Sequence, residues 1–154
     1  YIKIIKKLIL SLKLKKKVFV HRDFHISNIM IKKNKIYLID SQDAVFGNEA
    51  YDLASLIDDV RIKIKLKNRE KIYEKFISKH KKINPEKLRN DFEILSVLRN
   101  LKIIGIFTRL SKRDKKHKYL KLIPYAWKMI DERRKHNTRF EELNNFLSIY
   151  FQKI

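Results

Sequence analysis

The sequence predicts an α+β fold that is mostly helical, with a β-hairpin core near its N-terminal end and a helical bundle after it. Two β-rich runs flank a polar turn between residues 29 and 39. Apolar residues then recur at helical spacing through most of the chain. Of the 154 residues, 44% are hydrophobic and only two each are Gly and Pro, so a real core can be buried. We therefore expect residues 1–154 to form one domain.

The hairpin is the clearest β signal in the chain. Residues 29–31 and 36–39 are rich in side chains that favour strands. The turn between them, residues 32–35, is polar, and its Asn34 tolerates a positive φ. A further short apolar run, residues 18–20, ends at a cluster of polar groups. This pattern predicts two strands joined by a tight turn.

The rest of the chain is predicted to be helical, with no strand after Asp40. Helical spacing of apolar residues predicts helices over residues 1–16, 52–66, 69–80, 85–110, 118–134 and 139–152. Asn84 followed by Pro85 is a strong start signal, because Asn caps the first turn and Pro suits the first helical position.

Composition and charge exclude several classes of protein. The chain has no Cys, which excludes disulfide scaffolds, Cys-ligated zinc, iron–sulfur clusters and thiol catalysis. No window of 18 uncharged apolar residues occurs, so we expect no transmembrane helix and a cytoplasmic protein. The formal net charge of +21 would suit a nucleic-acid binder. Because Lys, Ile and Asn are abundant throughout, we favour compositional drift from AT-rich coding DNA instead.

Residues 21–28, together with an Asp after the hairpin, carry the chemistry. Asp23 can accept the proton of an attacking hydroxyl and aim its oxygen. Asn28 offers a neutral oxygen and Asp40 a charged one, and Mg²⁺ takes oxygen ligands of both kinds. The hairpin between these two residues folds back and brings them to one end. The spacing therefore predicts phosphoryl transfer that uses ATP and Mg²⁺.

Residues 21–28 resemble the catalytic loop of the protein-kinase-like fold. His25 stands where protein kinases usually have Lys, and in this the loop resembles the aminoglycoside phosphotransferase and choline kinase branch. Residues 38–44 and 51–56 look like the metal-binding segment of that branch and the helix after it. The resemblance implies the C-terminal lobe of that fold.

The resemblance also implies a role for each residue of the site. Asp23 would be the catalytic base, and Asn28 and Asp40 would be the Mg²⁺ ligands. Asp52 would brace the catalytic loop through hydrogen bonds to its backbone; the alternative is a favourable charge near a helix N-terminus. Support of the loop is implied for three further residues, His21, Arg22 and His25. Plain packing is the alternative interpretation of both histidines.

More narrowly, residues 42–44 and 99–110 resemble the bacterial amino-sugar kinases. Those enzymes phosphorylate the anomeric hydroxyl of N-acetylmuramate and N-acetylglucosamine in cell-wall recycling. The resemblance, which spans about residues 18–130, implies a small-molecule substrate. It makes Arg99 and Asn100 candidates for contact with the sugar, because Arg is well suited to bind a carboxylate. The alternative for Arg99 is a charge on the helix surface.

Two departures from the family pattern affect the expected activity. Ser41 stands where the family usually has Phe, which removes an apolar anchor beside Asp40. The phosphate-covering loop, the Lys and the Glu of an N-terminal lobe are not recognisable before residue 21. We therefore interpret the chain as the C-terminal catalytic lobe of a longer kinase.

The alternatives are a kinase of another small alcohol, of aminoglycoside, choline or homoserine type, and a non-catalytic basic module that binds nucleic acid or another anion. The intact trio of Asp23, Asn28 and Asp40 favours the enzyme, because a binding module does not need it. A protein kinase is disfavoured because the Ala-Pro-Glu signature is missing. A nucleic-acid binder would lose affinity steeply between low and physiological salt.

The isolated chain of residues 1–154 should transfer phosphate only weakly, because the groups that hold the α and β phosphates in such kinases are not recognisable in it. The measurement is phosphotransfer by this chain to N-acetylmuramate and to N-acetylglucosamine. Robust turnover would contradict the interpretation of the chain as one lobe of a larger catalytic unit.

Overall fold

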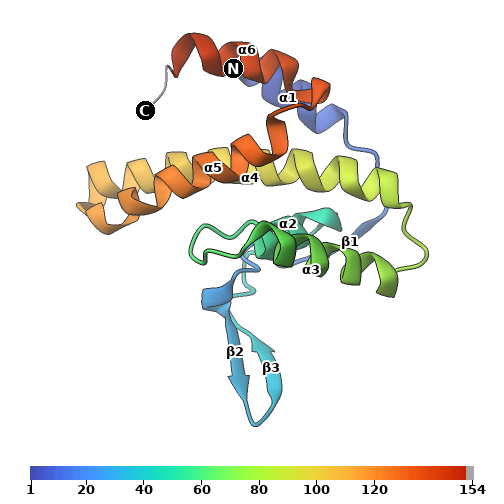
Figure 1. Ribbon diagram of the computed structural model, residues 1–154. Helices are drawn as coiled ribbons and strands as arrows, with labels where there is room; N and C mark the ends of the chain where they lie inside the picture. Colours follow the sequence, from blue (N-terminus) through green and yellow to red (C-terminus); the bar gives the residue numbers. More distant parts are fainter. Residues whose placement is uncertain (152–154) are drawn as a thin grey trace. The chain divides into compact units, whose positions relative to one another are not determined.

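The computed structural model describes residues 1–151 and divides into two compact units (Figure 1). The hairpin unit comprises residues 13–96, and the helical unit comprises residues 1–12 and the chain from residue 97 onward. Over the described residues the structure is α+β and mostly helical, as predicted, with two separate two-stranded sheets. The expectation that the chain acts as one domain stays a prediction.

Each unit has its own set of elements. The hairpin unit contains β1 (Lys17–Val20), the 3₁₀ turn η1 (Ile26–Asn28), β2 (Ile29–Lys32), β3 (Lys35–Leu38), β4 (Val45–Asn48), α2 (Ala50–Ile57), α3 (Leu66–Lys79) and the start of α4 (Pro85–Asp114). The helical unit contains α1 (Ile2–Leu10), the remainder of α4, η2 (His117–Leu122), α5 (Ile123–Arg134), η3 (Thr138–Phe140) and α6 (Glu141–Tyr150).

The predicted hairpin is confirmed as β2 and β3, which pair antiparallel from Ile29 opposite Leu38 to the tight turn. Lys33 and Asn34 have φ values of 48° and 60°. Two successive positive φ values are typical of the two-residue turns whose twist matches that of the strands. In Figure 1 the hairpin projects from the rest of its unit, and residues 30–40 are all exposed.

The expectation of no strand after Asp40 is wrong, because β4 pairs antiparallel with β1. Its four residues include Gly47 and Asn48, which are residue types that strands disfavour. Gly47 lies opposite Val18, and a Cβ at Gly47 would come within 3.3 Å of a methyl of Val20. The strand therefore depends on its long-range pairing with β1, which the composition of residues 45–48 does not predict.

The predicted helix over residues 52–66 is also too long, since α2 ends at Ile57 and α3 begins at Leu66. The break coincides with two buried carboxylates. Asp58 accepts hydrogen bonds from Arg69 at 2.8 Å and from the Ser96 hydroxyl at 2.6 Å. Buried charges need such partners, and reaching them takes the chain out of the helical path.

The start signal at residue 84 is confirmed. The side-chain oxygen of Asn84 accepts the backbone N–H of Lys87 at 2.9 Å, and α4 begins at Pro85. The helix then runs to Asp114 and contributes Leu88, Phe92 and Leu95 to the buried core. Local capping chemistry therefore sets this boundary.

The helical unit is built from buried residues of α5 and α6. Ala126, Met129 and Ile130 of α5 and Leu143 and Leu147 of α6 are buried. An ion pair between Lys7 and Glu142 links α1 to α6, which run close together in Figure 1. The last predicted helix is present, although the end predicted for it lies outside the described residues. Within residues 1–151 no helix is both long and apolar enough to cross a membrane.

Candidate active site

The loop of residues 21–28 leaves β1 and is held at its start by Asp52 of α2. One carboxylate oxygen of Asp52 accepts the backbone N–H of His21 at 2.6 Å, and the other accepts that of Arg22 at 3.0 Å. Arg22 has a φ of 72°, a conformation that is unfavourable for a residue with a side chain. These are the backbone contacts that the resemblance implies for Asp52, and they hold Arg22 in its strained conformation.

Asp23 is half-buried, and its carboxylate makes no hydrogen bond or ion pair with any described residue. Its backbone, by contrast, is tied down. The Asp23 carbonyl accepts the N–H of His25 at 2.9 Å and the side-chain amide of Asn28 at 3.1 Å. The backbone of this residue is therefore fixed while its carboxylate stays available to an incoming group.

Asn28 and Asp40 are brought together by the register of the hairpin. Ile29 pairs with Leu38, and the ladder continues with a bond from the Ile39 N–H to the Asn28 carbonyl at 3.1 Å. The Asn28 amide nitrogen consequently lies 3.4 Å from a carboxylate oxygen of Asp40. Asp40 itself has a φ of 67°, the second strained residue of the site.

His21 and Arg22 connect neighbouring parts of the site, and His25 lies buried between them and Asn28 in the sequence. The buried His21 ring donates from Nε2 to the Ile39 carbonyl at 3.0 Å, which ties the start of the loop to the residue before Asp40. The Arg22 side chain donates to the Asp43 carbonyl at 3.2 Å. His25 is buried, with 8% of its surface exposed. These contacts tie His21 and Arg22 to the segment around Asp40, and the support of the loop by all three residues stays a prediction.

The side chains of Asn28 and Asp40 fit a Mg²⁺ ion as a donor set. Asn28 has its amide oxygen left over when its nitrogen bonds to Asp23, and the same nitrogen lies 3.4 Å from the exposed Asp40 carboxylate. Mg²⁺ in nucleotide enzymes takes one or two protein oxygens and completes its shell with phosphates and water. Among residues 1–151 no group of three or more His, Cys, Asp or Glu side chains that could hold a metal ion occurs.

The predicted sugar contacts lie in the other unit. Arg99 and Asn100 belong to the part of α4 within the helical unit, and only 6% and 0% of their surfaces are exposed. Such burial is typical of side chains that pack inside a fold. The interpretation of Arg99 as a surface charge is therefore wrong, and contact of either residue with a sugar stays a prediction.

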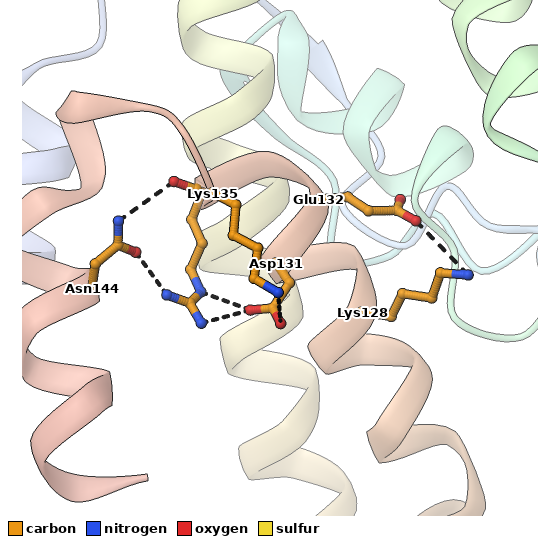
Figure 2. A network of polar contacts seen from close by, with 6 residues as sticks. Lys128, Asp131, Glu132, Lys135 and Asn144 are labelled. Carbon is orange, nitrogen blue, oxygen red and sulfur yellow. Dashed lines mark hydrogen bonds and ion pairs between the residues drawn. The ribbon is translucent and has the colours of Figure 1, made fainter. Parts of the chain in front are cut away.

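A large cavity of about 1320 Å³ lies within the helical unit, along α5 and α6, and Trp127 and Phe151 line part of it. Its charged groups are used in pairs with one another (Figure 2). Asp131 binds Lys135 at 3.1 Å and the Arg134 guanidinium at 2.6 Å, and Arg134 also donates to Asn144. None of the predicted site residues lines this cavity, so it is not the candidate active site.

Two residues with evident contacts to the site were missed at the level of sequence. Gln42 donates to the Asp40 carboxylate at 2.6 Å. Asp59 is buried and accepts the backbone N–H of Ile26 at 3.2 Å. The available signal for Asp59 was its position among apolar residues, since a carboxylate there needs a specific partner.

Comparison with known proteins identifies relatives of the chain. Residues 3–70 match the model of the phosphotransferase enzyme family. A curated protein of Neisseria meningitidis is 35% identical over 133 residues, which cover 82% of this chain and 39% of that protein. A protein of Caulobacter vibrioides is 29% identical over 119 residues, which cover 74% of this chain and 33% of that protein.

A third relative, from Pseudomonas aeruginosa, is 28% identical over 141 residues, which cover 86% of this chain and 41% of that protein. All three carry the name N-acetylmuramate/N-acetylglucosamine kinase. The chain therefore spans about a third to two fifths of the length of the curated relatives it matches.

Substitutions of Asp52 distinguish its support of the loop backbone from a favourable charge near the N-terminus of α2. Asp52→Ala should lower the free energy of unfolding by about 2 kcal/mol, because two loop N–H groups lose their acceptor. Asp52→Asn keeps one acceptor oxygen and should lower the free energy of unfolding by a smaller amount. Urea unfolding of the three proteins measures this, with Glu49→Gln as the control that removes a charge at the same helix end. Equal losses for Asp52→Ala and Glu49→Gln would favour the helix-charge interpretation.

Proposed function

Because residues 3–70 match the model of the phosphotransferase enzyme family, we propose that this chain carries the catalytic loop and metal-binding segment of a kinase that uses ATP and Mg²⁺. The fold that this proposal implies is the C-terminal lobe of a protein-kinase-like enzyme. The acceptor would be the hydroxyl group of a small molecule.

The observation that carries the proposal is the unengaged carboxylate of Asp23 on a braced backbone. Asp52 holds the two residues before Asp23, and Asn28 holds its carbonyl. A general base must meet the proton it accepts at hydrogen-bond distance and in a reproducible position. A fixed backbone with a free carboxylate supports that role better than a structural one.

The chain's own residues would position the reactants. Asp23 would accept a hydrogen bond from the acceptor hydroxyl, aim the hydroxyl oxygen at the phosphorus and take the hydroxyl proton as the new O–P bond replaces the bond to ADP, which leaves. Asn28 and Asp40 would hold the ion through an amide oxygen and a carboxylate oxygen. When bound, Mg²⁺-ATP supplies the transferable phosphoryl group and the positive charge that offsets its oxygens.

The substrate proposed is an amino sugar, phosphorylated at its anomeric hydroxyl as part of cell-wall recycling. Support comes from the name shared by the three relatives and from the match of 35% identity to one of them. The likeness of residues 42–44 and 99–110 to such kinases points the same way. Because one fold serves many acceptors, the substrate must be tested directly.

Asp23→Asn should abolish most phosphotransfer in the intact protein that contains these 154 residues. Loss of a general base lowers kcat by roughly 10²- to 10⁴-fold, while sugar binding is largely kept. The measurement is kcat and KM on N-acetylmuramate and N-acetylglucosamine, with the exposed Glu74→Gln as a matched control in the same unit. A kcat within threefold of the unmodified protein would rule out Asp23 as the base.

Arg99→Ala should raise the KM for N-acetylmuramate about tenfold, because an Arg–carboxylate contact is lost. N-acetylglucosamine has no carboxylate, so its KM should change much less. Because Arg99 is buried, Arg99→Lys and a urea unfolding curve distinguish lost contact from lost stability. An equal effect on both sugars would contradict contact between Arg99 and the carboxylate.

A further inference from the structure

A second carboxylate reaches the catalytic loop, at the opposite end from Asp52. Asp59 is 1% exposed and follows α2 by two residues. One of its oxygens accepts the backbone N–H of Ile26 at 3.2 Å. The other accepts the backbone N–H of Arg61 at 3.1 Å and the Arg61 guanidinium at 3.0 Å. The buried Asp59 carboxylate thus accepts a hydrogen bond from the loop N–H of Ile26, and the Arg61 guanidinium compensates its negative charge.

The neighbouring carboxylate has a different task. Asp58 is fully buried and binds Arg69 of α3 and Ser96 of α4, which secures the packing of the unit. The hydrogen bonds and the ion pair of Asp59 go instead to Ile26 and Arg61. Two consecutive buried acids with separate partners indicate that the bond to Ile26 is not a by-product of the Asp58 network.

The bond to Ile26 acts on the part of the loop that carries Asn28. Ile26 is the first residue of η1, and its carbonyl accepts the N–H of Ile29 at the end of that turn. The Asn28 N–H is bonded to the His25 carbonyl at 2.9 Å. A displacement of Ile26 would therefore be passed to Asn28 through one rigid turn.

Asp52 and Asp59 together hold the two ends of the loop from α2 and the segment after it. Asp52 binds the N–H groups before Asp23, whereas Asp59 binds the N–H that begins the turn of Asn28. The two carboxylates are seven residues apart, one within α2 and the other two residues beyond its end. One segment thus provides separate supports for the base and for the amide ligand.

We propose that Asp59 is a positioning residue for the metal-binding end of the catalytic loop, acting through the N–H of Ile26 on Asn28. This inference rests on the proposed function for the role of Asn28. The two carboxylates should therefore have different effects. Loss of Asp59 should weaken Mg²⁺ binding, whereas loss of Asp52 should mainly slow proton transfer to Asp23. Outer groups that orient a ligand commonly change metal affinity roughly 10- to 100-fold.

The contact itself is tested by amide hydrogen exchange on the chain. Asp59→Ala should speed exchange of the Ile26 amide about tenfold, because the bond that protects it is gone. Asp52→Ala should instead speed exchange at His21 and Arg22. Asp59→Asn has a single acceptor oxygen for both Ile26 and Arg61, so it should speed this exchange less, and it is the variant to use if Asp59→Ala fails to fold; Glu74→Ala is the exposed control. Ile26 exchange as slow in folded Asp59→Ala as in Glu74→Ala would overturn the inference.

The metal role is tested in the intact protein by the Mg²⁺ concentration needed for half-maximal phosphotransfer and by calorimetric titration with Mg²⁺ in the presence of ADP. Asp59→Ala should raise both constants at least tenfold relative to Glu74→Ala, and Asp59→Asn should raise them less because it keeps one acceptor oxygen. An active protein whose Mg²⁺ constants are unchanged by Asp59→Ala would overturn this inference alone. Absence of phosphotransfer and of Mg²⁺ binding in the unmodified protein would overturn the proposed function and this role with it.

Discussion

The candidate site depends on one carboxylate that holds the backbone of a short loop. Asp52 accepts two successive N–H groups, at 2.6 and 3.0 Å, and one of them belongs to Arg22 with its φ of 72°. A residue kept in that region costs on the order of 1–3 kcal/mol unless its surroundings compensate. Because the brace comes from α2 and acts on the backbone, Asp23 does not need its own side chain for support.

The register of the β2–β3 hairpin sets the relative positions of Asn28 and Asp40. Its two-residue turn fixes the register, and the register sets Asn28 opposite the residue before Asp40. A slip of one residue would turn every side chain of the strands to the other face and would separate the two oxygen donors. The turn at Lys33 and Asn34 is thus remote from the chemistry and still determines its geometry.

Local signals in the sequence predicted local structure well. The hairpin and the start of α4 at Pro85 are determined by nearby residues, through turn conformation and capping. Strand β4 and the end of α2 were mispredicted, because both follow from partners far along the chain. The Gly and Asn of β4 disfavour a strand, and only pairing with β1 creates it. Asp58 leaves the helix for partners 11 and 38 residues away.

The sequence by itself determined the chemical groups of this protein: a carboxylate at Asp23, and an amide and a carboxylate separated by a hairpin at Asn28 and Asp40. The tertiary structure decided which of these groups are engaged and which are free. It tied the backbone of Asp23 down and left its carboxylate without a partner among residues 1–151. It also recruited Asp59 to the loop. The physical reason is that a buried carboxylate must find hydrogen-bond donors, and packing alone decides where those donors lie.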